Sequence, residues 1–166
     1  MKKVLLVQVN KVDKSLLNAI SSFLTENGFS VKTYPEIFHV SVTSYEWDKN
    51  GYNSSSLLDS FAKRFYGYPY DVVLGIADVP IVTPSLFATK DKLALLFIRN
   101  LEDVSMDKTI ERLKKMSLFS IGKIAGLEGC KNQCIMRGFK DVHELDLLPN
   151  YYCEDCKARL NINDEG

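Results

Sequence analysis

The chain has 166 residues, of which 46% are apolar, and this is enough for a hydrophobic core and too many for a disordered chain. The 21 Lys and Arg residues balance the 21 Asp and Glu residues, so we expect no broad electrostatic surface for nucleic acid or anionic membranes. The sequence contains no run of about 18 apolar residues, so we expect no membrane-spanning helix. The apolar start is cut by Gln8 and is too short for a secretory signal, so a cytoplasmic protein is expected.

The first half of the chain shows hydrophobic spacing typical of alternating strands and helices. The predicted elements are a strand over 3–9, a helix from Asp13 to Thr25 closed by Asn27-Gly28, a strand over 29–34 ended by Pro35, a half-polar strand over 40–45, and a helix capped by Ser54 or Ser55 that runs to Tyr66.

The second half begins with a strongly apolar strand over 71–77. A loop with Pro80 and Pro84 follows, and then a strand over 92–98. Ser105 is a plausible cap for a long helix over 106–125 that ends near Gly126. The remainder, 128–160, has little periodicity and contains all four cysteines.

The four cysteines form two short-spaced pairs. Cys130 and Cys134 are separated by three residues, eighteen residues follow, and Cys153 and Cys156 are separated by two. Two such pairs can surround one Zn²⁺ as a tetrahedron with Zn–S distances of about 2.3 Å. Because four thiolates leave no open position, we predict one structural zinc ion that helps to fold the segment. The chain is then a single domain, with an α/β core over 1–127 and a zinc-binding segment over 128–160.

Other interpretations of the cysteine segment are two disulfides, four free thiols, or a zinc module that binds nucleic acid. Missing export signals weigh against disulfides. Five basic residues in the segment permit nucleic-acid binding, but five acidic residues balance them, so we expect no such partner. The basic residues are Lys131, Arg137, Lys140, Lys157 and Arg159, and the acidic ones are Asp141, Glu144, Asp146, Glu154 and Asp155.

Several segments together follow a known pattern. The matching residues are Gly126, Cys130, Cys134-Ile135-Met136, Cys153-Glu154-Asp155-Cys156, Tyr52-Asn53-Ser54-Ser55 and Leu74-Gly75-Ile76-Ala77-Asp78. They resemble the archaemetzincins, a metzincin-related group of zinc metallopeptidases. The first cysteine spacing is one residue shorter than in that family, and the loop before Cys153 is slightly shorter. The resemblance implies a metzincin-like mixed sheet packed with helices, with the zinc-stapled segment at its end.

The archaemetzincin signature H-E-x-x-H-x-x-G-x-x-H-C places three zinc-binding histidines and a catalytic glutamate before the first cysteine. In this sequence the three histidine positions hold Phe119, Lys123 and Gly129, and the glutamate position holds Ser120. A benzyl group and a bare α-carbon cannot bind a metal, an ammonium repels it, and serine is a poor general base. The resemblance also implies that Met136 packs as a floor below this site.

Two further hypotheses concern the same region. The Lys123 ammonium could occupy the space of the missing metal while Phe119 fills it with apolar surface, or Lys123 could simply point to solvent. A metal site built from His39, His143 and a carboxylate is conceivable, although the spacing gives no support for it.

From these absences we predict a catalytically inactive, archaemetzincin-like zinc-binding protein, not an enzyme, that binds a peptide or protein in its former substrate cleft. The alternatives are an active zinc metallopeptidase with non-standard ligands, and an interaction or nucleic-acid-binding zinc module. A peptide could add to a sheet edge, as substrates do in metzincin-like peptidases.

Overall fold

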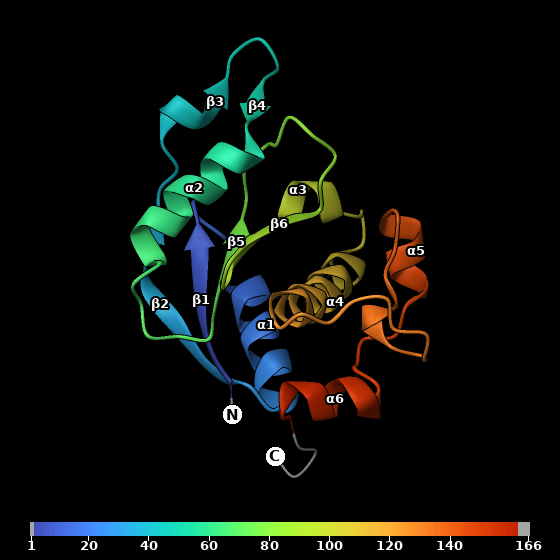
Figure 1. Ribbon diagram of the computed structural model, residues 1–166. Helices are drawn as coiled ribbons and strands as arrows, with labels where there is room; N and C mark the ends of the chain where they lie inside the picture. The colour runs from blue at the N-terminus through green and yellow to red at the C-terminus, as the bar shows by residue number, and fades with distance from the viewer. Residues whose placement is uncertain (1, 163–166) are drawn as a thin grey trace.

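The computed structural model describes residues 2–162 and shows an α/β fold built around one five-stranded sheet (Figure 1). The strands of this sheet are β1 (Lys3–Val9), β2 (Ser30–Phe38), β5 (Val72–Ala77), β6 (Phe87–Lys90) and β7 (Leu93–Phe97), in the order β2-β1-β5-β7-β6. The helices are α1 (Lys14–Glu26), α2 (Ser54–Phe65), α3 (Ile98–Leu101), α4 (Met106–Ile124), α5 (Val142–Leu147) and α6 (Glu154–Leu160).

The central strands run parallel, and β6 returns antiparallel to β7 at one edge of the sheet. Both β5 and β7 are buried along their whole length, as parallel strands are when helices cover both faces. Alternate residues of β1 enter two separate cores: Val4 and Leu6 face one, and Leu5 and Val7 face the other. Helix α2 covers one face, while α1 and α4 cover the opposite face (Figure 1).

The sequence predicted the first strand and the two helices α1 and α4 correctly. Asp13 caps α1 by accepting a hydrogen bond from the Ser15 N–H at 2.8 Å. Ser105 caps α4 through the Lys108 N–H. Gly126 follows the end of α4 with a φ of 91°, a left-handed conformation that favours glycine.

Strand β2 continues to Phe38, so the prediction that Pro35 ends it is wrong. Thr33 pairs with Leu6, whereas Ile37 pairs with Gln8, so β2 advances four residues while β1 advances two. The extra residues form a bulge that contains Pro35. Proline is accommodated here because β2 is an edge strand and a bulge needs no ladder hydrogen bond from it.

The predicted strand over 40–45 is also wrong. A short 3-10 helix, η1 (Val42–Ser44), takes its place, and the Ser41 Oγ accepts a hydrogen bond from the Thr43 N–H at 3.2 Å. Such local side-chain bonds compete with a sheet ladder. Of the predicted range, only Tyr45 lies in a strand, β3 (Tyr45–Glu46), which pairs with β4 (Gly51–Tyr52) in a separate two-stranded sheet.

Two other details differ from the prediction. Helix α2 is capped by Asn53 rather than Ser54 or Ser55, because the Asn53 Oδ1 accepts the Ser56 N–H at 3.0 Å. Strand β6 lies in a stretch for which we predicted only a loop. It is short and pairs only with β7, so it owes its conformation to its neighbour rather than to a pattern of its own.

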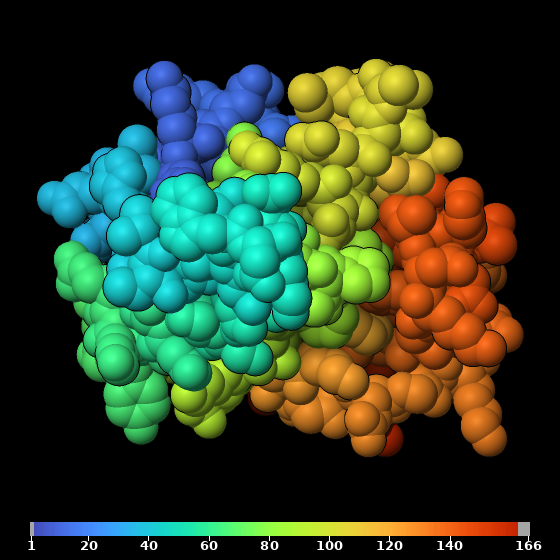
Figure 2. Space-filling model, turned by 90° about the horizontal axis from the view of Figure 1, so that it is seen from above, coloured from blue at the N-terminus to red at the C-terminus, as the bar shows by residue number. Residues whose placement is uncertain are grey.

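The segment with the cysteines packs beside α4 and includes η2 (Ile135–Arg137), α5 and α6. Met136, Leu145, Tyr152 and Leu160 belong to the same buried cluster as α1 and α4, so this segment shares the main core. Figure 2 shows it in orange and red, to the right of the β3–β4 region in cyan. None of the helices in the described part of the chain is long and apolar enough to cross a membrane.

Candidate metal centre and the end of helix α4

The four cysteines predicted to bind zinc lie together. Cys130 follows α4, Cys134 precedes η2, and Cys153 and Cys156 sit at the start of α6. Their Sγ atoms all lie within 4.8 Å of one another. Across residues 2–162, this is the only group of three or more histidine, cysteine or acidic side chains whose ligand atoms approach so closely.

The geometry of this group suits one zinc ion. The Sγ atoms of Cys130 and Cys153 are 3.6 Å apart, so they are not bonded as a disulfide. A tetrahedral zinc with Zn–S distances of about 2.3 Å places its sulfurs about 3.8 Å apart. Four sulfur donors also match the ligand preference of zinc and leave no position for substrate. The residues therefore fit a closed, structural zinc ion.

Hydrogen bonds orient two of the sulfurs. The Cys134 Sγ accepts the backbone N–H of Met136 at 3.4 Å and that of Cys153 at 3.3 Å. The Asn132 side-chain amide donates to the Cys153 Sγ at 3.5 Å and to the Asp155 carboxylate at 3.2 Å. Such partners around the ligands fix their direction. Sequence reasoning missed Asn132, and its position between the first two cysteines was the only available signal.

The thiols of the metal-free protein differ in acidity. Burial raises the pKa of Cys134 and of Cys156. Burial also opposes ionisation of Cys153, but hydrogen bonds from Asn132 and from its cysteine neighbours outweigh it and lower the pKa of Cys153 to about 6. A metal must therefore displace protons from the buried thiols in order to bind them.

The three positions that the archaemetzincin pattern gives to histidine lie at and after the end of α4. Phe119 packs against Phe87 of β6 at a ring-centroid distance of 5.5 Å and against Phe139 at 4.8 Å. Lys123, one turn later, is exposed, and its Nζ lies 6.0 Å from the Phe119 ring centroid. Gly129 is exposed with a φ of 61°, and a Cβ there would have no neighbour within 4 Å.

A zinc ion held by three histidines does not fit these side chains. The Phe119 ring is enclosed by two other aromatic rings, and neither it nor Gly129 has an electron pair to donate. The Lys123 ammonium carries a like charge, and its distance from the ring is the outer limit, about 6 Å, of a cation–π contact. Lys123 thus combines features of both hypotheses: it is exposed, yet its ammonium stays near Phe119.

Ser120, at the position of the family's glutamate, is fully buried, and its Oγ has no hydrogen-bond partner among the described residues. Met136 is fully buried against the neighbouring turn of α4. A Cβ added at Gly122 would come within 2.9 Å of the Met136 Cε and closer still to its Sδ. Gly122 therefore provides the space that Met136 fills, and Met136 does pack beneath this part of α4.

The two histidines do not form a metal site with each other. His39 is exposed after β2, and His143 is exposed on α5. In the part of the chain that the structure describes, neither belongs to a group of three close ligands.

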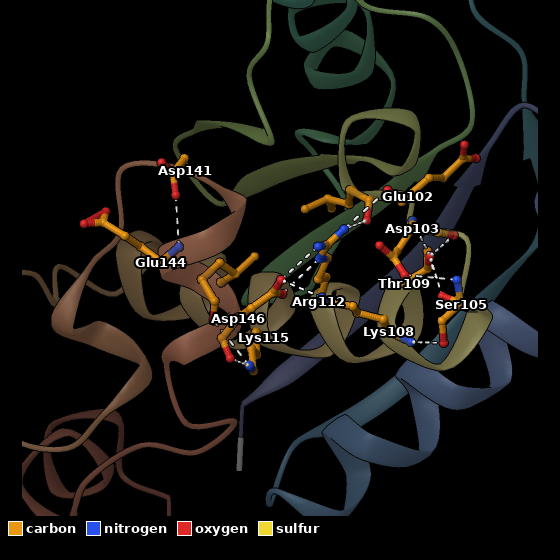
Figure 3. A network of polar contacts seen from close by, with 12 residues as sticks. Glu102, Asp103, Ser105, Lys108, Thr109, Arg112, Lys115, Asp141, Glu144 and Asp146 are labelled. Carbon is orange, nitrogen blue, oxygen red and sulfur yellow. Dashed lines mark hydrogen bonds and ion pairs between the residues drawn. The ribbon is translucent and has the colours of Figure 1, made fainter.

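A buried ionic network ties α4 to α5, the helix that lies between the two cysteine pairs in the sequence (Figure 3). The Arg112 guanidinium donates two hydrogen bonds to the Asp146 carboxylate, at 2.9 and 2.8 Å, and a third to the Leu101 carbonyl. The Lys115 ammonium donates to the carbonyls of Leu145 and Asp146. The Arg112 guanidinium holds the pKa of Asp146 below its usual value. This network could not be predicted from the sequence, because charged residues on a helix are usually solvated.

A hollow of about 230 Å³ lies beside β6 and the aromatic residues that surround Phe119. Its lining residues are Pro84, Ser85, Leu86, Phe87, Phe139 and Lys140. Because β6 ends the sheet, its outer side pairs with no other strand among the described residues. The hollow and the free strand edge together form a surface that an extended peptide could occupy.

The fold and the cysteine cluster define an α/β protein with four sulfurs that could hold a metal ion, and comparison with known proteins identifies its family. The model of Peptidase family M54 matches residues 65–162. An archaemetzincin from Sulfolobus acidocaldarius is 31% identical over the full length of both chains. One from Nanoarchaeum equitans is 29% identical over 84% of this chain and 80% of its own.

Solved structures show the same fold. The archaemetzincin of Archaeoglobus fulgidus, complexed with malonate, superposes with a TM-score of 0.77 at 23% identity, over 95% of this chain and 99% of its own. A zinc-dependent peptidase from Methanocorpusculum labreanum gives a TM-score of 0.77 at 18% identity, over 95% and 100%.

This chain belongs to Peptidase family M54, a family of zinc metallopeptidases. That finding corrects our prediction of a catalytically inactive protein. The match to a peptidase family and to a full-length archaemetzincin gives no sign of inactivity, and it agrees better with the alternative of an active metallopeptidase. The prediction relied entirely on four side chains and gave too little weight to the likeness of the remaining chain.

Proposed function

We propose that this chain acts on peptides as a zinc-dependent peptidase of the archaemetzincin type, with a hydrolytic ligand set other than three histidines. The observation that carries the proposal is the 31% identity to an archaemetzincin over the full length of both chains. Such extended similarity covers the core and the cysteine segment together rather than isolated motifs, which supports the proposal.

The peptide is proposed to lie along the outer edge of β6. Backbone groups of an edge strand can pair with an extended peptide, and pockets beside the strand then select alternate side chains. Here the neighbouring hollow is lined by Phe87, Phe139 and Leu86, with Lys140 at its rim. We therefore expect a preference for peptides with an apolar side chain at the position facing the hollow.

One zinc ion is proposed to sit on the four cysteines and to have a structural role, because that site is closed. The side chains of Phe119, Lys123 and Gly129 cannot hold a second zinc in the family's manner. A hydrolytic metal therefore requires other donors, and a count of two zinc ions per intact chain, rather than one, would show that such donors exist.

The test is digestion of a peptide library by the zinc-loaded chain, with products identified by mass spectrometry. The expected result is cleavage that a chelator abolishes and zinc restores. Phe139→Ala should raise KM by opening the hollow. Leu147→Ala, a change at an exposed residue of α5, is the matched control and should leave KM unchanged. Absence of cleavage across the library would contradict the proposal.

A further inference from the structure

The cysteine centre is unevenly protected from solvent. Cys134 and Cys156 are buried, with 0% and 4% exposure, whereas Cys130 and Cys153 are only half-buried. A hollow of about 270 Å³ opens beside Cys130 and also borders Cys156, with Lys131, Asn132 and Arg159 among its other lining residues. The difference in exposure, rather than the hollow, makes one cysteine of each pair more accessible to a small solute than the other.

The two accessible sulfurs are also close neighbours. The Sγ atoms of Cys130 and Cys153 lie 3.6 Å apart, and a disulfide requires an approach to about 2 Å. Cys134 is a poorer candidate, because it is buried and two backbone N–H groups hold its sulfur. Burial and contacts thus single out a bond that joins the two cysteine pairs.

We propose that Cys130 and Cys153 are a reversible oxidation site at which a peroxide forms a disulfide and releases the zinc ion. The Cys130 thiolate attacks a peroxide oxygen, the O–O bond breaks, and a sulfenic acid and hydroxide form. The Cys153 thiolate then attacks the sulfenyl sulfur, the S–O bond breaks, and a second hydroxide leaves as the S–S bond forms. Each thiolate gives up one electron, and one hydrogen peroxide molecule is reduced.

The consequence is local rather than global. The disulfide removes two of the four zinc ligands, so the zinc ion is released, but the new S–S bond still joins the loop that carries Cys130 to the start of α6. Helix α5 keeps a separate attachment, because Arg112 and Asp146 bind each other independently of the cysteines. Oxidation should thus free Cys134 and Cys156 from the metal, while the disulfide keeps the two cysteine segments joined and α5 stays docked on α4.

The experiment treats the zinc-loaded full chain with increasing hydrogen peroxide. Zinc release is followed with a chromogenic chelator, and disulfides are mapped by mass spectrometry after thiol blocking. The expected first product is a Cys130–Cys153 disulfide, with one zinc released for each bond and full recovery on adding reductant and zinc. A first product that contains Cys134 or Cys156, or zinc release without a disulfide, would overturn the proposal.

A second measurement requires no substitution of a cysteine. Maleimide labelling of the zinc-loaded chain should modify Cys130 and Cys153 about tenfold faster than the two buried cysteines, since reactivity follows exposure. Asn132→Ala removes the amide that contacts Cys153 and should change the labelling rate of Cys153 but not that of Cys130. Gln133→Ala, at the exposed neighbouring position, is the control and should change neither rate. Equal labelling of all four cysteines would contradict the inference.

Discussion

The Arg112→Met substitution tests the buried network that holds α5 against α4. Methionine fills a similar length but cannot donate the two hydrogen bonds to Asp146 or the one to the Leu101 carbonyl. The Arg112 side chain is only 7% exposed, while that of Asp146 is 20% exposed, so the variant leaves a mostly buried carboxylate without its main partner.

Removing one member of a buried ion pair costs about 3–5 kcal/mol. Two features of this site adjust that range. Asp146 keeps some solvent contact and an ion pair with Lys108 at 3.5 Å, which reduces the loss, whereas the Leu101 carbonyl loses its donor, which adds to it. We expect a loss of about 3 kcal/mol, equivalent to a fall in Tm of about 6–12 °C for a chain of this length.

Urea unfolding of the zinc-loaded protein at pH 7 measures this loss. Arg99→Met is the matched control, because Arg99 pairs with Asp78 at the surface and such pairs contribute about 0–1 kcal/mol. If Arg112→Met lowers the free energy of unfolding no more than Arg99→Met does, the buried network does not stabilise the fold.

The pH dependence of the same variant has a defined sign. Arg112 lowers the folded-state pKa of Asp146, so this stabilisation is complete above the unfolded pKa of about 3.9 and is lost as pH falls through the folded pKa. The difference in unfolding free energy between wild type and Arg112→Met should therefore be largest at neutral pH and shrink below about pH 4. Because both proteins lose zinc in acid, the comparison isolates the ion pair.

Three other outcomes follow from the same region. Gly122→Ala should destabilise the protein by about 1–2 kcal/mol in urea unfolding, because the added methyl group displaces Met136. This cost exceeds the stability that alanine gains over glycine as a helix former. A variant as stable as the wild type, or more stable, would contradict the packing of Met136 on Gly122. Ser120→Ala should be neutral or stabilising because its Oγ has no partner, whereas Ser117→Ala loses a hydrogen bond to a helix carbonyl; the reverse order would refute this assignment. Zinc affinity measured by chelator competition should rise from pH 6 to 8, and calorimetry at pH 7 should show that zinc binding releases about two protons or more. These protons should come chiefly from the buried thiols rather than from Cys153. Zinc binding without proton release would count against thiolate ligands.

The parts of the fold with strong local signals could be predicted from sequence. Helices α1 and α4 have apolar spacing and a capping side chain, Asp13 or Ser105, and both are present as expected. The errors occur where tertiary contacts decide. Strands β3 and β4 are short and each depends on pairing with the other, and β6 likewise depends on pairing with β7. The edge position of β2 allows Pro35 to lie inside a bulge.

At the site, the cysteine spacing predicted the ligand cluster because two short-spaced pairs need little further information to converge. The supporting residues could not be predicted in this way. Asn132 contacts a sulfur only once the two pairs meet, and the burial of Arg112 depends on how α5 docks on α4. The prediction of inactivity failed for a different reason. It was drawn from four residue positions alone, whereas the similarity of the whole chain to an archaemetzincin is the better guide to function.

Native mass spectrometry of the wild type and of Cys156→Ser tests most directly whether the four cysteine sulfurs hold a zinc ion. The variant should carry one zinc ion fewer per chain than the wild type, because a serine hydroxyl does not replace a thiolate. An unchanged zinc count would contradict the assignment of the cysteine centre.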